Sequence, residues 1–514
     1  MIQAALGASD TGDGANIPSR YVFDEGHHIF DAADSAFAAH LSGREMAELR
    51  RWLLGNEGGG SRRAGGRARG LRERAAALIA DDDFAAIEAL ESALNVGKIL
   101  PAPGWLNRLS GATTDGPAEE FLAEVREQIF TRNKAADSPY SLETETRPPS
   151  EGLSYAAAVL REELVALAKP LRKLCARLTQ RLDNDAEELE SATRVRIEAV
   201  TRALQRRSEM LIGAWIDMLD AISQPQSDAF VDWIEVERVD GREIDAGLYR
   251  HWIDPTLPFA RAMAPIAHGI VFTSATLTDR TATDGIDWVS ANARTGAVHF
   301  PGPAIESRVT SPFEYGQQTR VFIVTDVHRN DPDQVAAAMR ELFLAAGGGG
   351  LGLFTSIARL RQVYARMANA LDAAGLPLYA QHVDSLNVAT LIDIFRAESD
   401  SCLLGTDAVR DGVDVPGHSL RMLAFDRVPW PRPTILHRAR RKSFGGRTHD
   451  DLLARLRLAQ AYGRLIRRTS DKGVFVILDA ATPTRLLGAF PEEVVPERVG
   501  LVDAIEATGE FLAI

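Results

Sequence analysis

The chain has 514 residues, of which 45% are hydrophobic and 25% are charged, and its formal net charge is −13. This length exceeds what one hydrophobic core supports, so we expect about three domains. The acidic balance argues against a protein that coats nucleic acid uniformly, although it leaves room for local basic tracks.

The number of cysteines and the hydropathy of the sequence indicate the cellular compartment. Two cysteines, Cys175 and Cys402, can form neither a disulfide framework nor a four-cysteine metal site. The N-terminus lacks the basic and apolar segments of a signal peptide, and no apolar run reaches membrane-spanning length. We therefore expect a cytoplasmic protein that does not associate with membranes.

The first predicted element is a short strand over residues 21–23 that runs directly into Asp24 and Glu25. Nucleotide-hydrolysing motors use one carboxylate at such a position to hold Mg²⁺ and another to polarise the attacking water. The pattern therefore predicts that Asp24 binds Mg²⁺ and that Glu25 activates water. The alternative is a solvated turn, because acidic residues and glycine are common in turns.

Helical patterns dominate from Ala33 to about Ile222. Leucines recur at steps of three and four residues between Leu160 and Leu178, which predicts a long amphipathic helix within a helical hairpin. We interpret this block as one inserted helical domain.

Strand patterns return at residues 230–238 and 247–253, and we expect them to rejoin the sheet that carries Asp24. The apolar run that follows ends in Ser274, Ala275 and Thr276. Ligands bind at the carboxyl ends of strands in α/β sheets, so these hydroxyls could link a nucleotide site to neighbouring groups. The alternative is a strand end that is merely capped by hydroxyls.

After residue 300 short apolar strands alternate with amphipathic helices, which predicts a parallel sheet covered on both faces. The predicted strands are 321–325, 350–355, 378–381, 402–405, 420–425 and 474–478, and the predicted helices are 333–345, 357–373, 387–397 and 449–467.

A glycine-rich and acidic loop over residues 405–417 follows one of these strands. Gly412 would allow a ligand to approach the backbone closely, and Asp411 and Asp414 could hydrogen-bond ribose, water or an arginine. The loop could equally be an ordinary connection between a strand and a helix.

The helix predicted over residues 449–467 contains a second candidate nucleotide segment. Gln460, Arg464 and Arg467 would share one helix face, with Gly463 beside them. Two guanidinium groups there would neutralise negative charge on a γ-phosphate. The alternative is a solvated basic helix face.

The order of these segments resembles that of superfamily 2 helicases with a D-E-x-H box, and more narrowly of the DinG/XPD branch of ATP-dependent DNA helicases. The resemblance rests on residues 24–27, 271–277, 353–356, 411–417 and 460–467. The large helical insertion corresponds to the arch domain of that family.

The resemblance implies an α/β fold with two RecA-like motor lobes, of which the first is incomplete, and a large α-helical arch-like insertion. Residues 1–32 would be a remnant of the first motor lobe with the acidic box, and residues 33–227 the insertion. Residues 228–300 would return to the first lobe, and residues 301–514 would form the second lobe.

The resemblance also implies roles for individual residues. Asp24, Glu25, His27, Arg464 and Arg467 would be catalytic, with His27 coupling hydrolysis to movement and the two arginines acting as arginine fingers. The nucleotide would lie near Gln460, Gly463, Asp411, Gly412 and Asp414. The lobes would be linked by Ser274, Ala275 and Thr276. DNA would contact Thr355, Ser356, Arg438 and Arg441.

The resemblance further implies that ATP and Mg²⁺ are the cofactors and that single-stranded or forked DNA is the partner. His27 and His28 as metal ligands are a further alternative, but no other ligand has suitable spacing.

The sequence departs from the family in two respects. It lacks the phosphate-binding loop G-x-x-x-x-G-K-[ST], because none of its lysines both follows a glycine and precedes Ser or Thr. The family's iron–sulfur cysteines would lie upstream of the acidic box, so we expect no iron–sulfur cluster in this chain.

We therefore expect the C-terminal portion of a DNA helicase of repair or replication, with the missing N-terminal helicase segment as a candidate partner. The alternative is a non-catalytic DNA-binding or interaction module without ATPase activity of its own.

Overall fold

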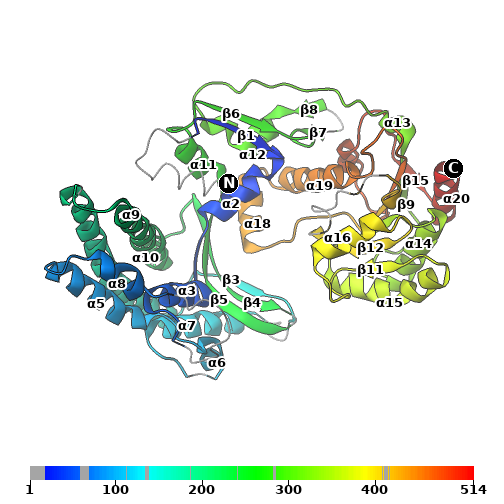
Figure 1. The fold of residues 1–514 in the computed structure, drawn as a ribbon. Helices are drawn as coiled ribbons and strands as arrows, with labels where there is room; N and C mark the ends of the chain where they lie inside the picture. The colour runs from blue at the N-terminus through cyan, green and yellow to red at the C-terminus, as the bar shows by residue number, and fades with distance from the viewer. Residues whose placement is uncertain are drawn as a thin grey trace. The chain divides into compact units, whose positions relative to one another are not determined.

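The computed structural model describes residues 18–57, 69–111, 113–133, 138–185, 187–239, 241–281, 285–407, 409, 415 and 417–513. The chain divides into two units (Figure 1). Unit 1 comprises Met1–Ala32, Thr256–Pro433 and Arg441–Ile514, and unit 2 comprises Ala33–Pro255 and Thr434–Arg440. No described helix combines the length and the apolar character needed to span a bilayer.

The larger part of unit 1 is a seven-stranded sheet with the strand order β11-β12-β10-β13-β14-β9-β15, in which every pairing is parallel. Its strands are β9 (Thr319–Val324), β10 (Gly350–Leu353), β11 (Leu378–Ala380), β12 (Cys402–Gly405), β13 (Met422–Phe425), β14 (Gly473–Ile477) and β15 (Glu497–Val499). These strands confirm the predicted parallel α/β lobe. The sequence pattern misses β15, because two of its three residues are charged.

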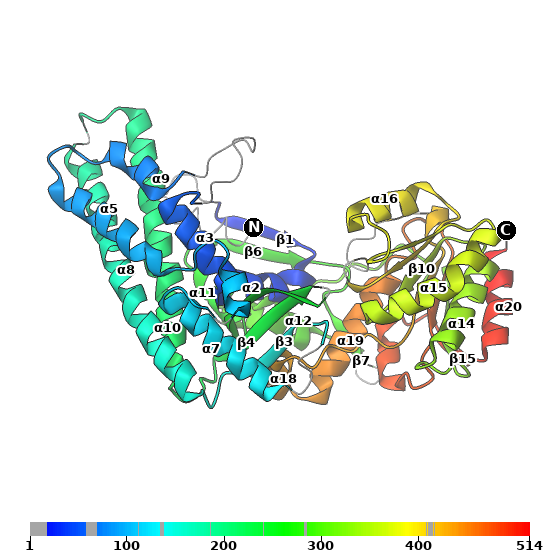
Figure 2. The ribbon, with the colours of Figure 1, turned by 90° about the horizontal axis from the view of Figure 1, so that it is seen from below.

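Helices cover both faces of this sheet, as Figure 2 shows. Helices α14 (Pro332–Ala345), α15 (Ile357–Ala373) and α20 (Leu501–Leu512) pack against one face. Helices α16 (Val388–Ala397) and α19 (Arg447–Tyr462) pack against the other. Strands buried on both faces need the near-continuous apolar runs from which they were predicted.

A smaller part of unit 1 contains the acidic strand. Strand β1 (Arg20–Asp24) pairs in parallel with β6 (Gly269–Thr273), and Asp24 lies opposite Thr273. Phe23 packs against Phe259 of α11 (Thr256–Met263) on one face of this pair. On the other face the side chains of Val22 and Val271 remain 66% and 55% exposed. Within the described part of the chain, this two-stranded parallel sheet is therefore covered on one face only.

The remaining elements of unit 1 are short. They are η1 (Gly26–His28), α2 (Ile29–Phe37, shared with unit 2), the paired strands β7 (Asp279–Thr281) and β8 (Gly285–Asp287), α12 (Trp288–Thr295), η5 (Ala297–His299), α13 (Tyr315–Gln318), η6 (Gly417–Ser419) and η7 (Thr484–Ala489).

Unit 2 is built around the long helix α8 (Glu151–Asn184), whose leucines between Leu160 and Leu178 are all buried. This confirms the predicted amphipathic helix. The other helices are α3 (Gly43–Leu54), α4 (Leu71–Ala75), η2 (Ala76–Leu78), α5 (Phe84–Val96), η3 (Gly97–Ile99), α6 (Trp105–Ser110), α7 (Pro117–Arg132), α9 (Ser191–Gln205), the π-helix η4 (Arg206–Leu211) and α10 (Ile212–Ile222).

Unit 2 also contains a four-stranded antiparallel sheet with the order β2-β5-β4-β3. Its strands are β2 (Ala39–Ser42), β3 (Leu142–Glu145), β4 (Phe230–Val239) and β5 (Arg242–Trp252). We expected residues 230–252 to rejoin the sheet of Asp24, but they pair with strands of the insertion instead. Their alternation of polar and apolar residues is typical of antiparallel strands, whereas β6 is a continuous apolar run.

A short segment from the second half of the chain belongs to unit 2. Helix α18 (Ile435–Ser443) packs Ile435 against Val231 and Trp233. The buried Arg440 donates to both carboxylate oxygens of Asp34, at 2.5 and 3.1 Å, and the Nδ1 of His251 lies 2.8 Å from the same carboxylate. One carboxylate thus fastens α18 to the antiparallel sheet.

We predict that Asp34→Asn destabilises unit 2, because it leaves Arg440 buried beside a neutral amide, a change that costs about 3–5 kcal/mol. Burial raises the pKa of Asp34, but hydrogen bonds from His251 and Arg440 outweigh it and hold that pKa below its ordinary value. The contribution of Asp34 to folding stability is therefore present above about pH 4 and lost as the pH falls further.

Thermal unfolding of both proteins between pH 3 and pH 7 tests this prediction. The stability difference between the wild type and Asp34→Asn should shrink towards low pH. Asp393→Asn, which removes an exposed pair with Arg396, is the control and should change stability little. A stability difference that is the same at every pH would contradict the prediction.

Candidate functional site

The acidic strand end is an exposed pair of carboxylates at the carboxyl end of β1. Asp24 is the last residue of the strand, and its Oδ1 accepts a hydrogen bond from the backbone N–H of Glu25 at 3.0 Å. Glu25 adopts φ 51° and ψ 46°, a left-handed conformation that is uncommon for residues other than glycine. Such backbone strain costs about 1–3 kcal/mol and is concentrated at functional sites.

The imidazole of His27 joins this strand end to β6. Its Nδ1 lies 2.6 Å from Ser274 Oγ, 3.3 Å from Thr276 Oγ1 and 3.3 Å from Glu25 Oε2. Ser274 also donates to Glu25 Oε2 at 3.4 Å. We call these four residues, Glu25, His27, Ser274 and Thr276, the coupling cluster. The structure thus brings together two segments of the predicted site that are separated by 247 residues in sequence.

A glycine allows the two strands to approach each other at this point. A Cβ added to Gly26 would lie 3.1 Å from Phe272 Cβ, which is tighter than an ordinary contact. The turn after β1 can therefore lie directly against β6 because residue 26 has no side chain.

The donor groups at this edge fit Mg²⁺ when a nucleotide is also bound. Among the described residues no group of three or more His, Cys, Asp or Glu side chains could hold a metal ion by itself. Mg²⁺ usually takes only one or two carboxylates from a protein and completes its shell with phosphate oxygens and water. The exposed carboxylate of Asp24 meets that requirement.

The arginine segment, residues 460–468, does not continue α19 as we expected. Helix α19 ends at Tyr462, and Gly463 is its C-cap. Gln460 therefore lies in the last helical turn, whereas Arg464 and Arg467 lie in the turns beyond it. The prediction that these three residues share one helix face is wrong.

Burial of the following apolar residues explains why the helix stops. Leu465 and Ile466 enter the core, and Asp471 Oδ2 accepts hydrogen bonds from the backbone N–H groups of Arg467 and Arg468 at 2.9 and 2.8 Å. A Cβ added to Gly463 would lie 3.4 Å from the nearest neighbouring atom, an ordinary contact. No described atom of the protein itself therefore comes close enough to Gly463 to require glycine there.

The loop over residues 405–417 is anchored at both ends. Gln381 Oε1 accepts hydrogen bonds from the N–H and the hydroxyl of Thr406, at 3.0 and 2.9 Å. Gly417 has φ 77°, and a Cβ added to it would lie 4.0 Å from Arg468 Nη1. The end of this loop therefore lies beside the arginine segment. The predicted residues Asp411, Gly412 and Asp414 lie outside the described residues.

The residues predicted to contact DNA are distributed over both units. Thr355 and Ser356 follow β10, the third strand in the order of the seven-stranded sheet, and Ser356 is the N-cap of α15. Arg441 belongs to unit 1 and donates to Asp450 at 2.6 Å, whereas Arg438 belongs to unit 2.

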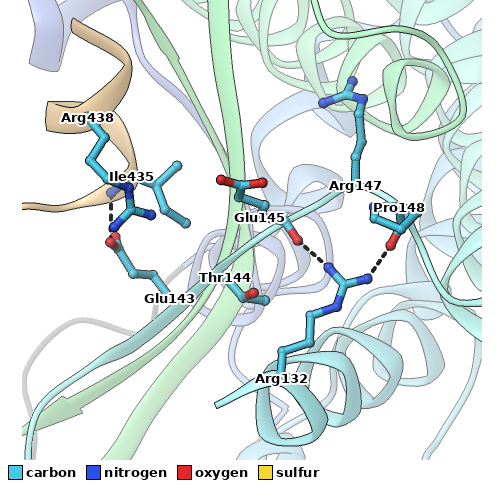
Figure 3. A pocket seen from close by; sticks show the side chains of 8 residues that line it. All are labelled: Arg132, Glu143, Thr144, Glu145, Arg147, Pro148, Ile435 and Arg438. Carbon is cyan, nitrogen blue, oxygen red and sulfur yellow. Dashed lines mark hydrogen bonds between the residues drawn. The ribbon is translucent and has the colours of Figure 1, made fainter. Parts of the chain in front are cut away.

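Arg438 lines a pocket of about 440 Å³ in unit 2 (Figure 3). The pocket is lined by Arg132, Glu143, Thr144, Glu145, Arg147, Pro148, Ile435 and Arg438. Arg132 donates to the carbonyls of Glu145 and Pro148, and Arg147 donates to two carbonyls near the end of α10. Glu143 accepts from the N–H of Ile435 at 2.7 Å. Glu143 thus holds residues 434–440 against β3, whereas Arg132 and Arg147 bind backbone carbonyls elsewhere in unit 2.

The sequence reasoning missed two buried aspartates of unit 1, Asp426 and Asp479. Asp426 directly follows β13 and accepts from Arg359 at 2.6 Å, and Asp479 accepts from Arg329 at 3.0 Å. Arg359 also donates to the carbonyl of Arg329 at 2.7 Å. Both aspartates come at or just after the end of an apolar strand, which is the signal that drew attention to Asp24 and could have found them.

Comparison with known proteins shows that parts of this chain are similar to helicases. Residues 339–496 match the family model of the helicase C-terminal domain. The ATP-dependent helicase DinG of Mycobacterium tuberculosis is 34% identical over 247 residues, which cover 46% of this chain and 35% of that protein. The 3'-5' exonuclease DinG of Bacillus subtilis is 28% identical over 266 residues (49% of this chain, 28% of that protein). The ATP-dependent DNA helicase YoaA of Escherichia coli is 30% identical over 190 residues (35% of this chain, 29% of that protein).

These matches span only about a third of the length of the curated relatives. Within that span they confirm the resemblance to DinG-like helicases that the motifs indicated.

We predict that Gly405→Ala destabilises unit 1 and disturbs the start of the 405–417 loop. The added Cβ would lie 2.4 Å from Val409 Cγ2, so the buried Val409 has to move. Overpacking of this kind typically costs about 1–3 kcal/mol. Thermal or urea unfolding measures the loss.

Gly269→Ala is the matched control in the same unit, because a Cβ there meets nothing within 4 Å. This variant should retain the stability of the wild type to within about 1 kcal/mol. Equal stability of the two variants would refute the packing role of Gly405.

Proposed function

We propose that this chain, with its confirmed resemblance to DinG-like helicases, forms the C-terminal portion of an ATP-dependent DNA helicase. It would couple ATP hydrolysis to movement along single-stranded DNA and to unwinding of forked DNA, in DNA repair or replication. The observation that carries the proposal is the coupling cluster, in which His27 joins the carboxylate of Glu25 to Ser274 and Thr276.

The proposed chemistry assigns one task to each group at the strand ends. Asp24 would hold Mg²⁺, which neutralises charge on the nucleotide phosphates when it is bound. Glu25 would orient the attacking water, since its carboxylate is exposed beside Asp24. Arg464 and Arg467 would place positive charge near the γ-phosphate oxygens.

The coupling cluster offers a route from hydrolysis to movement. His27 Nδ1 and Ser274 Oγ both contact Glu25 Oε2. A change in what Glu25 binds therefore alters the hydrogen bonds of His27 and Ser274, and Ser274 directly follows β6. We propose that this rearrangement transmits the state of the nucleotide to the segment beyond β6.

The proposed activity requires a phosphate-binding loop, which this sequence does not contain. We propose that the partner is an α/β segment that carries this loop, equivalent to the N-terminal helicase segment. The uncovered face of β1 and β6, with Val22 and Val271 exposed, supports the proposal, because parallel sheets are normally covered on both faces. Single-stranded DNA would contact Thr355, Ser356, Arg438 and Arg441.

We predict that the purified chain alone hydrolyses little or no ATP, even with single-stranded DNA present, because the phosphates have no loop to bind them. A DNA-stimulated ATPase assay measures this. Substantial turnover by the chain alone would refute the assignment of the loop to another segment. Binding of single-stranded DNA that falls steeply with salt, with no hydrolysis even after a phosphate-loop segment is added, would support the non-catalytic alternative.

We predict that Arg464→Ala and Arg467→Ala each abolish hydrolysis in a motor completed by a phosphate-loop segment. Loss of an arginine finger lowers kcat by about 10³-fold or more, whereas binding of single-stranded DNA should persist. Arg366→Ala on α15 is the control, because Arg366 pairs at the surface with Asp333. Normal turnover in either of the first two variants would remove the arginine-finger assignment.

A further inference from the structure

Unit 1 contains a buried ion pair that no motif predicted, between Asp279 and Arg455. Arg455 Nε lies 2.8 Å from Asp279 Oδ1, and Arg455 Nη2 lies 2.5 Å from Asp279 Oδ2. The side chains are 5% and 8% exposed, respectively. Two parallel N–H···O bonds of this kind fix direction as well as distance.

One end of the pair is tied to the coupling cluster. Asp279 begins β7 and follows Thr276 by only three residues. The half-buried Arg294 of α12 donates to the carbonyl of Leu277, which lies within that short connection, at 2.6 Å. A hydrogen bond from α12 therefore also holds the segment between the coupling cluster and Asp279.

The other end of the pair is tied to the arginine segment. Arg455 lies within α19 and precedes Gln460 by five residues, about 8 Å of rigid helix. Arg455 also donates to the carbonyl of Arg485, and Arg485 donates to Asp451 of the same helix at 2.6 Å. The guanidinium of Arg455 is thus held by the carbonyl of Arg485, which is itself tied to α19, as well as by the carboxylate of Asp279.

Stability alone explains this pair poorly. Burying two charges costs desolvation energy, and well-packed apolar residues of similar size often stabilise a protein equally well or better. A buried bidentate pair does hold two elements in one relative orientation, which an apolar contact does not.

We propose that Asp279 and Arg455 are positioning residues that hold the coupling cluster and the arginine segment in a fixed relation across unit 1. The pair links β7, which follows residues 274–276, to the helix that ends at the arginine segment. The effect of this pair on catalysis rests on the proposed helicase function. The structural link that the pair makes between β7 and α19 does not depend on that function.

Hydrogen exchange of the chain by itself tests the mechanical link without any ATPase activity. We expect Arg455→Met and Asp279→Asn to speed exchange at least tenfold in two places: the backbone amides of β7 and those of residues 464–471. Unchanged exchange at either place would overturn the proposal.

Arg250→Met is the matched control. Arg250 makes a bidentate pair with Asp232 in unit 2, at 2.7 and 3.0 Å, with side chains that are 13% and 8% exposed. This variant should speed exchange in unit 2 and leave β7 and residues 464–471 as in the wild type. Acceleration there as large as in Arg455→Met would show a general loss of stability and refute a specific link.

A variant with an apolar pair, Asp279→Leu with Arg455→Met, separates positioning from stability. We expect it to unfold at a temperature near that of the wild type. In the motor completed by a phosphate-loop segment, its kcat should fall at least tenfold, with KM for ATP and the affinity for single-stranded DNA unchanged. A wild-type kcat in this variant would overturn the positioning role, while the activity of the completed wild type independently tests the helicase proposal.

Discussion

The hydrogen bonds of one histidine define the candidate site. His27 Nδ1 lies within 3.3 Å of oxygens from Glu25, Ser274 and Thr276, although residues 33–255 of unit 2 separate the two segments in sequence. Among the described residues, β1 and β6 form a sheet of two strands. The positions of Asp24 and Glu25 therefore depend on the pairing of these strands, on the contacts of this one imidazole and on the close approach that Gly26 permits.

Much of the fold follows from local patterns in the sequence, because each pattern has a physical cause that acts within one element. The buried strands of the second lobe are continuous apolar runs, and α8 carries a leucine stripe, so both were predicted. The placement of Asp24, Ser274 and Thr276 at adjacent strand ends follows from the same logic. The local patterns did not reveal which strands pair with each other. β4 and β5 are strands as expected, but they pair within unit 2. Strand pairing depends on tertiary context, which a local pattern does not encode.

Two further differences have the same origin. The end of α19 is set by the burial of Leu465 and Ile466, which the helical period of the sequence does not reveal. Arg438 and Arg441 were expected to contact DNA, yet Arg441 pairs with Asp450, and the neighbouring Arg440 is buried against Asp34. Arginine supplies five donors in a rigid fork, so this chain uses several arginines to join elements rather than to present charge. A count of basic residues therefore overstates the surface that is open to a phosphate backbone.

The uncovered face of β1 and β6 has a thermodynamic consequence. A ligand that binds only the folded form of a segment stabilises it in proportion to the logarithm of the ligand concentration. Any polypeptide that covers Val22 and Val271 would thus stabilise the strand pair that carries Asp24 and the coupling cluster. The seven-stranded sheet, whose faces are already covered on both sides, gains nothing from the same event. The fraction of molecules in which Asp24 and the coupling cluster are ordered would then depend on the concentration of the polypeptide that covers β1 and β6. The seven-stranded sheet would stay folded at every concentration of that polypeptide.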